Sequence, residues 1–181
     1  MRVLSLLLLF SLGPGLFGAG EAVGRRAPGF SLPDRTFKYQ DPLDYRGRIL
    51  IVEFMQTTCP HCAEFSKILQ EASTKYGGKV AVLSIVNPPD TLDKVTAYVA
   101  AHKLTFPILF DTGQVAFSFL QWKPGQTAGM NIPRVFVIDP NGIIRLDLEY
   151  SVMTKEVFEG RGLFAELDKL LQAQSPAGVK K

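Results

Sequence analysis

Two cysteines separated by two residues, Cys59 and Cys62, are the side chains in this sequence best suited to chemistry, and the 181 residues contain no others of this type. A disulfide between them would close a very small loop, so it would add little stability as a cross-link. Alternatively, the two cysteines could form half of a zinc site. Zinc would then need two further ligands, and the only histidines in the sequence are His61 and His102. The spacing therefore favours a thiol–disulfide redox centre, with no metal or other cofactor expected.

The two thiols should differ in reactivity because of their places relative to a helix. The apolar run at residues 48–54 predicts a buried strand, and helical periodicity begins at Pro60. Cys59 would then precede the first helical residue, where unpaired N–H groups and the helix dipole stabilise a thiolate. Cys62 would lie one turn further along and be less exposed. We expect Cys59 to attack a disulfide and Cys62 to resolve the mixed disulfide.

Two neighbouring side chains could tune these thiols. His61 lies between them and could donate a hydrogen bond to the Cys59 sulfur and lower its pKa, or it could simply be solvated. Glu53 interrupts the apolar strand, where burying a carboxylate is costly unless it is protonated or paired. It could accept the proton of the Cys62 thiol. Alternatively, it lies at an edge position and reaches solvent.

The elements that must position these residues follow a recognisable order. A strand at 48–54, a helix from Pro60 that stops at Gly77-Gly78, and a strand at 79–86 predict a right-handed βαβ unit with parallel strands. The other predicted elements are a hairpin within 27–39, a helix ending at His102 and capped by Asp90 or Thr91, a strand at 106–110, a helix at 113–120, antiparallel strands at 135–139 and 143–150, and a helix at 158–171. This order predicts an α/β thioredoxin fold, in which helices flank a central mixed sheet, with an N-terminal hairpin and an inserted strand–helix unit.

Within that layout, the loop before the strand at 135–139 should lie opposite the thiols. A cis Ile132–Pro133 bond would expose the backbone of Ile132 for pairing with an extended substrate segment. Alternatively, Pro133 has no such role, because proline is common at the first position of a strand. We assign Ile132 and Pro133, together with Pro60, to the predicted substrate-binding surface.

The first 22 residues have the pattern of a secretory signal peptide. Arg2 is followed by an uncharged, leucine-rich run at 3–17 and then by small residues, with cleavage expected after Gly20 or Ala22. An uncleaved anchor is the alternative, although the run is short for a membrane span. We therefore expect a secreted or periplasmic protein that meets the membrane only through its signal segment, with a domain at 23–174 and a disordered tail at 175–181.

The composition is that of an ordinary globular protein, with 46% hydrophobic and 20% charged residues. The net charge is +3 and the basic residues are scattered, which argues against nucleic-acid binding. The expected partners are protein thiols and disulfides, together with an unidentified membrane or periplasmic redox protein.

Four segments carry a family resemblance: residues 24–34, 52–62, 131–133 and 137–143. Through them the chain resembles the thioredoxin superfamily and, within it, the exported AhpC/TSA-redoxin branch that includes TlpA- and ResA-like proteins. The resemblance implies that Cys59 is the nucleophile, Cys62 the resolving thiol and Pro133 the cis-proline. It also implies that Glu53 occupies the buried acidic position of thioredoxin-like strands.

The direction of electron flow stays open at this point. The Pro60-His61 dipeptide is typical of DsbA-like oxidases, which donate disulfides, whereas the flanking sequence resembles a TlpA-type reductase. A copper metallochaperone of the same fold, which would hold the ion through Cys59, Cys62 and His61, is a further alternative. A peroxiredoxin is disfavoured because its motif would need proline at position 52 and threonine at position 56, where this chain has Val52 and Gln56.

Overall fold

The structure is a computed structural model that describes residues 20–123 and 129–174. Most of the predicted signal peptide, part of the loop before Asn131 and the predicted tail lie outside the described residues. None of the helices in the two described ranges is long and apolar enough to cross a lipid bilayer.

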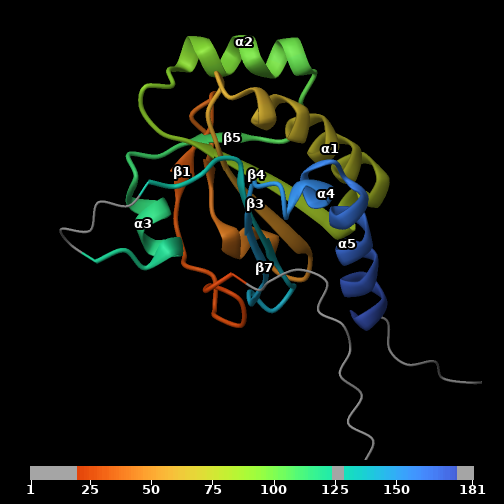
Figure 1. Ribbon diagram of the computed structural model, residues 1–181. Helices are drawn as coiled ribbons and strands as arrows, with labels where there is room; N and C mark the ends of the chain where they lie inside the picture. The colour runs from red at the N-terminus through yellow and green to blue at the C-terminus, as the bar shows by residue number, and fades with distance from the viewer. Residues whose placement is uncertain (1–19, 124–128, 175–181) are drawn as a thin grey trace, which may run out of the picture.

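A five-stranded mixed sheet forms the centre of the fold (Figure 1). Its strands are β3 (Ile49–Met55), β4 (Val80–Val86), β5 (Ile108–Phe110), β6 (Arg134–Ile138) and β7 (Ile144–Glu149). They lie in the order β5-β4-β3-β6-β7, with β3, β4 and β5 parallel and β6 and β7 antiparallel to their neighbours. The predicted βαβ unit and the predicted antiparallel pair are both confirmed.

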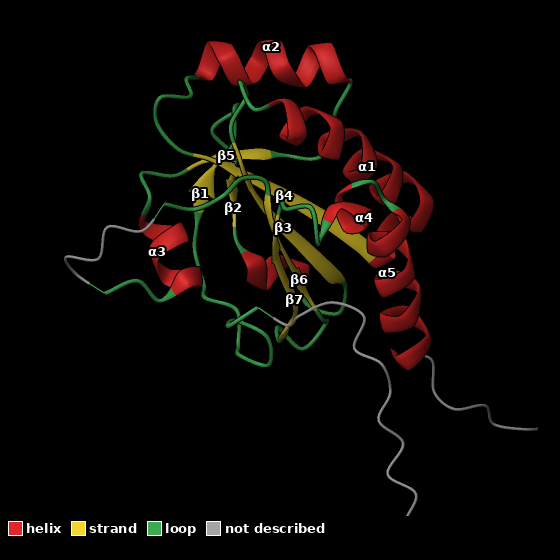
Figure 2. Ribbon diagram, in the orientation of Figure 1, coloured by secondary structure: helices red, strands yellow, loops and turns green. Residues whose placement is uncertain are grey.

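Helices cover both faces of this sheet (Figure 2). On one face, α1 (Pro60–Tyr76), α2 (Leu92–His102), α4 (Lys155–Phe158) and α5 (Arg161–Gln174) pack over the side chains of Ile49, Ile51 and Met55. On the other face, α3 (Gln114–Leu120) and the N-terminal segment pack over Leu50, Val52 and Phe54. All seven residues of β3 are buried, as expected for a central strand with two covered faces.

The N-terminal hairpin and the inserted unit are also confirmed. The strands β1 (Leu32–Pro33) and β2 (Tyr39–Gln40) pair antiparallel, and a short 3-10 helix at Pro42–Tyr45 leads into β3. The inserted unit is β5 followed by α3, and β5 extends the sheet beside β4. The architecture is therefore the predicted one.

The C-terminal helix differs from the expectation in where it begins. The sequence predicts a helix over 158–171, and the structure has this helix as α5, which begins at Arg161 and runs to Gln174, with the separate short helix α4 before it. Gly160 lies between them with a φ of +96°, a conformation that ends a right-handed helix and suits glycine. A Cβ at this position would also lie 3.2 Å from the side chains of Ile68 on α1 and of Phe164, so a larger residue would crowd both.

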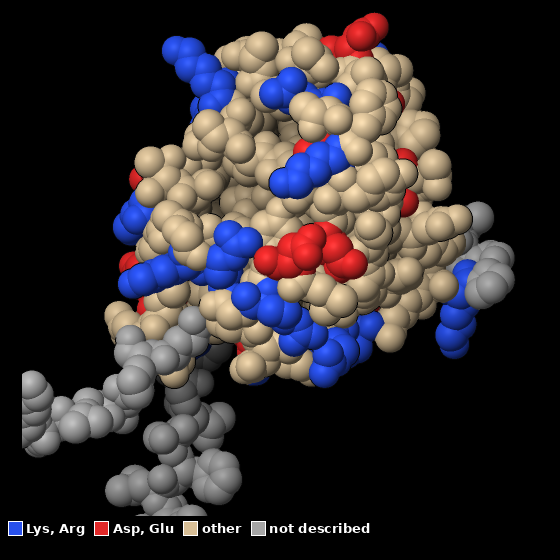
Figure 3. Space-filling model, turned by 180° about the vertical axis from the view of Figure 1, so that it is seen from behind, with Lys and Arg blue, Asp and Glu red and all other residues tan. Residues whose placement is uncertain are grey.

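The charged side chains of the surface are mixed in sign. Seen from behind (Figure 3), the lysine and arginine side chains form several separate groups, with acidic side chains between them. This face therefore does not present a single continuous basic band.

Candidate active site

Cys59 is the N-cap residue of α1. Its backbone is extended (φ −84°, ψ 117°), and its sulfur accepts a hydrogen bond from the Cys62 N–H at 3.2 Å. The sulfur thus takes the place that a serine or aspartate oxygen usually fills at a helix N-terminus. Free N–H groups and the dipole of a helix favour negative charge at such a position, and here the Cys62 amide points at the Cys59 sulfur.

Cys62 lies one turn further along, and its exposed fraction is 0%, whereas Cys59 is partly exposed. Burial raises the pKa of the Cys62 thiol, and its hydrogen bond to the Cys59 sulfur and the nearby Glu53 raise it further. The predicted asymmetry in exposure, with one accessible sulfur and one sheltered sulfur, is confirmed. Both cysteines are free thiols in the structure.

Glu53 lies in the middle of the central strand, directly between Ser84 of β4 and Val135 of β6. The alternation of β3 turns Glu53 to the same face as Ile51 and Met55, which is the face that α1 covers. Its exposed fraction is 0%, so the alternative in which Glu53 reaches solvent at an edge position is wrong. A carboxyl group is thus held in the core beneath the helix that carries the two thiols.

The surroundings of Glu53 favour its neutral form. Burial raises the pKa of this carboxyl to about 8, although a hydrogen bond from Ser84 opposes the shift. The Ser84 hydroxyl donates to Oε2 at 2.5 Å, while Oε1 is buried without a hydrogen-bond partner. One oxygen of the carboxyl is therefore fixed by Ser84, and the other makes no hydrogen bond to any described residue.

The Ile132–Pro133 peptide bond is cis, as predicted from the sequence. The Ile132 carbonyl oxygen lies 3.9 Å from the Cys59 sulfur, within reach of a thiol hydrogen bond. The Pro133 carbonyl accepts a hydrogen bond from the Tyr150 N–H at 2.9 Å, which ties the loop to the end of β7. The structure thus brings the predicted substrate-binding residues Ile132 and Pro133 next to the exposed thiol.

His61 makes a contact that the sequence did not predict. Its imidazole stacks on the ring of Tyr150, with the ring centroids 4.0 Å apart and the planes 19° from parallel. No hydrogen bond joins the imidazole to the Cys59 sulfur among the residues that the structure describes. An effect of His61 on the Cys59 thiol stays a prediction. Pro60 lies beside His61 as the first residue of α1 and is exposed.

The loop before Cys59 is held by Asp90, which the sequence suggested only as a possible helix cap, whereas Thr91 is the N-cap of α2. The carboxylate of Asp90, in the turn after β4, accepts hydrogen bonds from the Thr57 N–H, at 3.0 Å, and from the Thr57 hydroxyl. The loop between β3 and α1 is therefore fixed to a second segment, two residues ahead of Cys59. Nothing in the local sequence pattern connects these two residues, since they are 33 positions apart.

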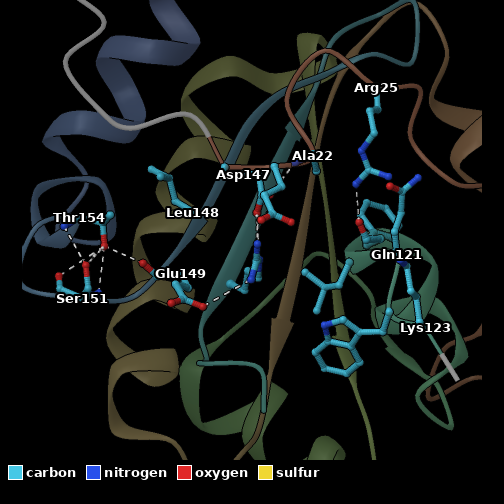
Figure 4. Close-up of a pocket in the computed structure, with 15 residues that line it drawn as sticks. Ala22, Arg25, Gln121, Lys123, Asp147, Leu148, Glu149, Ser151 and Thr154 are labelled. Atoms are coloured by element: carbon cyan, nitrogen blue, oxygen red, sulfur yellow. Dashed lines mark hydrogen bonds and ion pairs between the residues drawn. The ribbon is translucent and has the colours of Figure 1, made fainter. Parts of the chain in front are cut away.

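Two hollows are lined by residues that are neighbours of the site in the sequence. A hollow of about 330 Å³ is lined by the stacked His61 and Tyr150 and by Phe158, with carboxylates of Glu64 and Glu159 at its edge. A larger one, of about 710 Å³, lies on the α3 side of the sheet beside Arg134 and is drawn in Figure 4. The smaller hollow is thus next to the CxxC segment through His61, although neither cysteine lines either hollow.

Chemically, this arrangement supports thiol–disulfide exchange. It holds an accessible thiol at a helix N-terminus, a buried second thiol within reach of it, and a carboxyl group whose pKa lies near neutrality. Among the described residues, no group of three or more His, Cys, Asp or Glu side chains could hold a metal ion.

A family model described as AhpC/TSA family matches residues 23–146 of the chain, including both cysteines. The chain belongs to the AhpC/TSA family. This part of the sequence runs from the N-terminal segment to β7, so it includes the CxxC pair, Glu53 and the cis-proline loop of this AhpC/TSA protein.

Curated relatives of this AhpC/TSA protein include two from Bacillus. The thioredoxin-like protein YneN of Bacillus subtilis is 27% identical over 145 residues, which cover 77% of this chain and 78% of YneN. The thiol-disulfide oxidoreductase ResA of Bacillus thuringiensis is 28% identical over 166 residues, which cover 88% of this chain and 91% of ResA. Both alignments extend over most of each protein.

Solved structures show that the fold is the thioredoxin fold. A putative thioredoxin from Neisseria meningitidis has a TM-score of 0.66 at 23% identity and covers 84% of this chain and 93% of its own. A putative thiol:disulfide interchange protein DsbE from Chlorobium tepidum has a TM-score of 0.63 at 23% identity, and the match covers 79% of this chain and 96% of the DsbE chain. The predicted fold class is therefore confirmed.

Proposed function

We propose that the protein is an extracytoplasmic thiol–disulfide oxidoreductase that exchanges disulfides with protein cysteines through Cys59 and Cys62. The observation that carries the proposal is the hydrogen bond from the Cys62 N–H to the Cys59 sulfur, at a helix N-terminus where the second thiol is buried. The names of its relatives, which include thiol-disulfide oxidoreductases, support the same activity.

In the first step, the Cys59 thiolate attacks one sulfur of a substrate disulfide. A new bond joins Cys59 to that sulfur, the substrate S–S bond breaks, and the leaving thiolate takes a proton from solvent. The Ile132 carbonyl, 3.9 Å from the Cys59 sulfur, lies where the backbone of an extended substrate segment would pair. Ile132, Pro133 and Pro60 are thus the proposed substrate-binding residues.

In the second step, Cys62 resolves the mixed disulfide. Its pKa is raised, so the thiol needs a base before it can attack, and the proposed base is the ionised carboxyl of Glu53. The Cys62 thiolate then attacks the Cys59 sulfur, the substrate leaves as a thiolate, and a Cys59–Cys62 disulfide remains. Two electrons have passed to the substrate, and the reverse sequence donates a disulfide instead.

The proposal includes export and a redox partner. Residues 1–22 have the pattern of a signal peptide, with cleavage expected after Gly20 or Ala22, and residues 23–174 form the proposed redox domain. A thiol–disulfide exchanger outside the cytosol needs a partner that restores its redox state. We assign this role to an unidentified membrane or periplasmic redox protein.

Reduction of a protein disulfide by the mature chain tests the activity. We expect the dithiol form to reduce insulin, Cys59→Ser to abolish the reaction, and Cys62→Ser to accumulate a mixed disulfide with the substrate. Equilibration with glutathione then gives the reduction potential of the Cys59–Cys62 pair and with it the direction of electron flow. A potential near that of thioredoxin indicates a reductase, whereas a much more oxidising potential indicates a disulfide donor. Stoichiometric copper binding without any disulfide reduction would instead favour the metallochaperone.

A further inference from the structure

Asp147 is a buried carboxylate whose two oxygens serve different parts of the chain (Figure 4). It lies on β7 with an exposed fraction of 2%. Oδ1 pairs with the guanidinium of Arg134, with nitrogen–oxygen distances of 2.8 and 2.9 Å. Oδ2 accepts a hydrogen bond from the Ala22 N–H at 3.1 Å. The backbone of the N-terminal segment is thus bound to a buried carboxylate of the sheet.

This segment is built into the fold from Gly20 onward. The Ala22 side chain has an exposed fraction of 1%, and the Val23 N–H donates to the Gly20 carbonyl at 3.1 Å. The next residues run beside β7, where the Gly24 N–H donates to the Ile144 carbonyl at 2.9 Å. A Cβ on Gly20 would lie 2.5 Å from Oδ2 of Asp147, so this position packs directly against the carboxylate.

The two cleavage bonds that the sequence allows have different consequences for Asp147. Cleavage after Ala22 would remove the N–H that Oδ2 accepts and leave a buried charged oxygen short of a donor, which is costly. Cleavage after Gly20 would keep Ala22 and its hydrogen bond to the carboxylate, and would remove the Gly20 carbonyl that accepts the Val23 N–H. The new amino group would be that of Glu21, whose nitrogen lies between Gly20 and Ala22, the two residues that contact the carboxylate.

We propose that the leader is removed between Gly20 and Glu21, and that the new α-ammonium group binds the Asp147 carboxylate. A signal peptidase of the host hydrolyses the bond with water, so that Gly20 leaves with a carboxylate and Glu21 gains the ammonium. Gly18 and Gly20 supply the small residues required before such a bond. The inference rests on the export included in the proposed function.

Processing at this bond reaches the redox site through Asp147. Arg134 follows Pro133 directly and pairs with the same carboxylate that receives the new amino group. The mature N-terminus and the strand that begins at the cis-proline loop therefore share one buried acceptor.

Intact mass spectrometry of the exported protein tests the cleavage bond. The full chain is expressed in a bacterium with a signal peptidase and recovered from the periplasm. We expect a chain that begins at Glu21. A chain that begins at Val23, or at any other residue, overturns the inference and leaves export intact, whereas a chain that keeps Met1 and stays in the cytosol overturns both.

Chemical denaturation tests the ammonium contact. Three chains are compared: one beginning at Glu21 with a free amino group, the same chain N-acetylated, and one beginning at Val23. We expect acetylation to lower the folding equilibrium constant about tenfold, because a charge-assisted hydrogen bond is lost, and we expect Asp147→Asn to abolish that difference. Equal stability of the free and acetylated chains, or an equal difference in the Asp147→Asn background, would show that the ammonium does not bind Asp147.

Discussion

The Ser84 hydroxyl donates a hydrogen bond to Oε2 of Glu53 across two adjacent parallel strands, and both side chains are fully buried. The contact fixes one oxygen of the carboxyl beneath the helix that carries the thiols. The other oxygen is buried and has no hydrogen-bond partner among the described residues, and it is the oxygen that the proposed mechanism uses as the base for Cys62. Glu53 and Ser84 thus form a unit whose ionisation can be measured.

The pKa of about 8 for Glu53 predicts a pH-dependent stability. A carboxyl whose folded pKa lies above its unfolded value of 4.5 stabilises the fold below pH 4.5, and that contribution is lost as the pH rises through 8. The difference is on the order of 5 kcal/mol. Urea unfolding from pH 4 to 9 should show Glu53→Gln gaining stability relative to the wild type as the pH rises. Parallel curves would contradict the raised pKa, and Glu64→Gln, an exposed carboxyl on α1, is the control.

Removal of the Ser84 hydroxyl should raise the pKa of Glu53 further, because the hydrogen bond from Ser84 favours the ionised carboxyl. In Ser84→Ala we expect the pH midpoint for release of substrate from the mixed disulfide to move upward. Ser84→Thr, which keeps a hydroxyl, should retain the wild-type midpoint. Single-turnover kinetics between pH 6 and 10 measure it, and a midpoint unchanged in Ser84→Ala would exclude Glu53 as the base.

His61→Pro should shift the Cys59–Cys62 pair toward a more reducing potential. If His61 stabilises the reduced pair, its loss favours the disulfide, and each tenfold change in that equilibrium corresponds to about 30 mV. Equilibration with glutathione measures the potential. Tyr150→Leu removes the ring on which His61 stacks and tests whether that contact holds the imidazole in place. A potential that His61→Pro leaves unchanged would remove His61 from the mechanism.

The clamp between Asp90 and Thr57 should hold the loop that leads to Cys59. Asp90→Asn keeps the size of the side chain but weakens its two hydrogen bonds from Thr57, with an expected cost of about 1–3 kcal/mol in unfolding free energy. The reaction of Cys59 with an aromatic disulfide should slow as its position loosens. Asp93→Asn, an exposed carboxyl in the first turn of α2, serves as the control. Equal reaction rates in the two variants would show that the clamp does not position Cys59.

The break between α4 and α5 should depend on Gly160. Gly160→Ala places a Cβ 3.2 Å from Ile68 at a φ of +96°, so it should cost about 1–3 kcal/mol of unfolding free energy. Gly78→Ala is the matched control, because a Cβ there meets no atom within 4 Å. Thermal melts of both variants measure the difference. If the two melt together, the close packing of Gly160 on α1 is not important for stability.

The layout around the thiols could be predicted because the local signals agree there. An unbroken apolar run indicated β3, and the two cysteines marked the start of a helix that Gly77 ends. Which residues face each other across the sheet could not be predicted, because the sequence pattern does not specify the register between neighbouring strands. Glu53 and Ser84 are each the fifth residue of a seven-residue apolar strand. The presence of one polar residue inside each run was the signal from which their pairing could have been inferred.

Other features depend on distant contacts. The stacking of His61 on Tyr150 and the clamp from Asp90 to Thr57 join segments that only the folded chain brings together. The break at Gly160 was hidden because the apolar positions on either side keep helical spacing, and tertiary packing decided against one continuous helix.

The sulfur of Cys59 also fastens the first turn of α1, because it accepts the Cys62 N–H. A thiolate is a stronger acceptor for that amide than a sulfur locked in a disulfide. If the proposed exchange closes the pair to a disulfide, the hydrogen bond from the Cys62 amide should weaken, and the first turn of α1 should be less stable than in the dithiol form. The reduction potential of the pair should therefore depend on the first turn of α1 as well as on the two sulfur atoms.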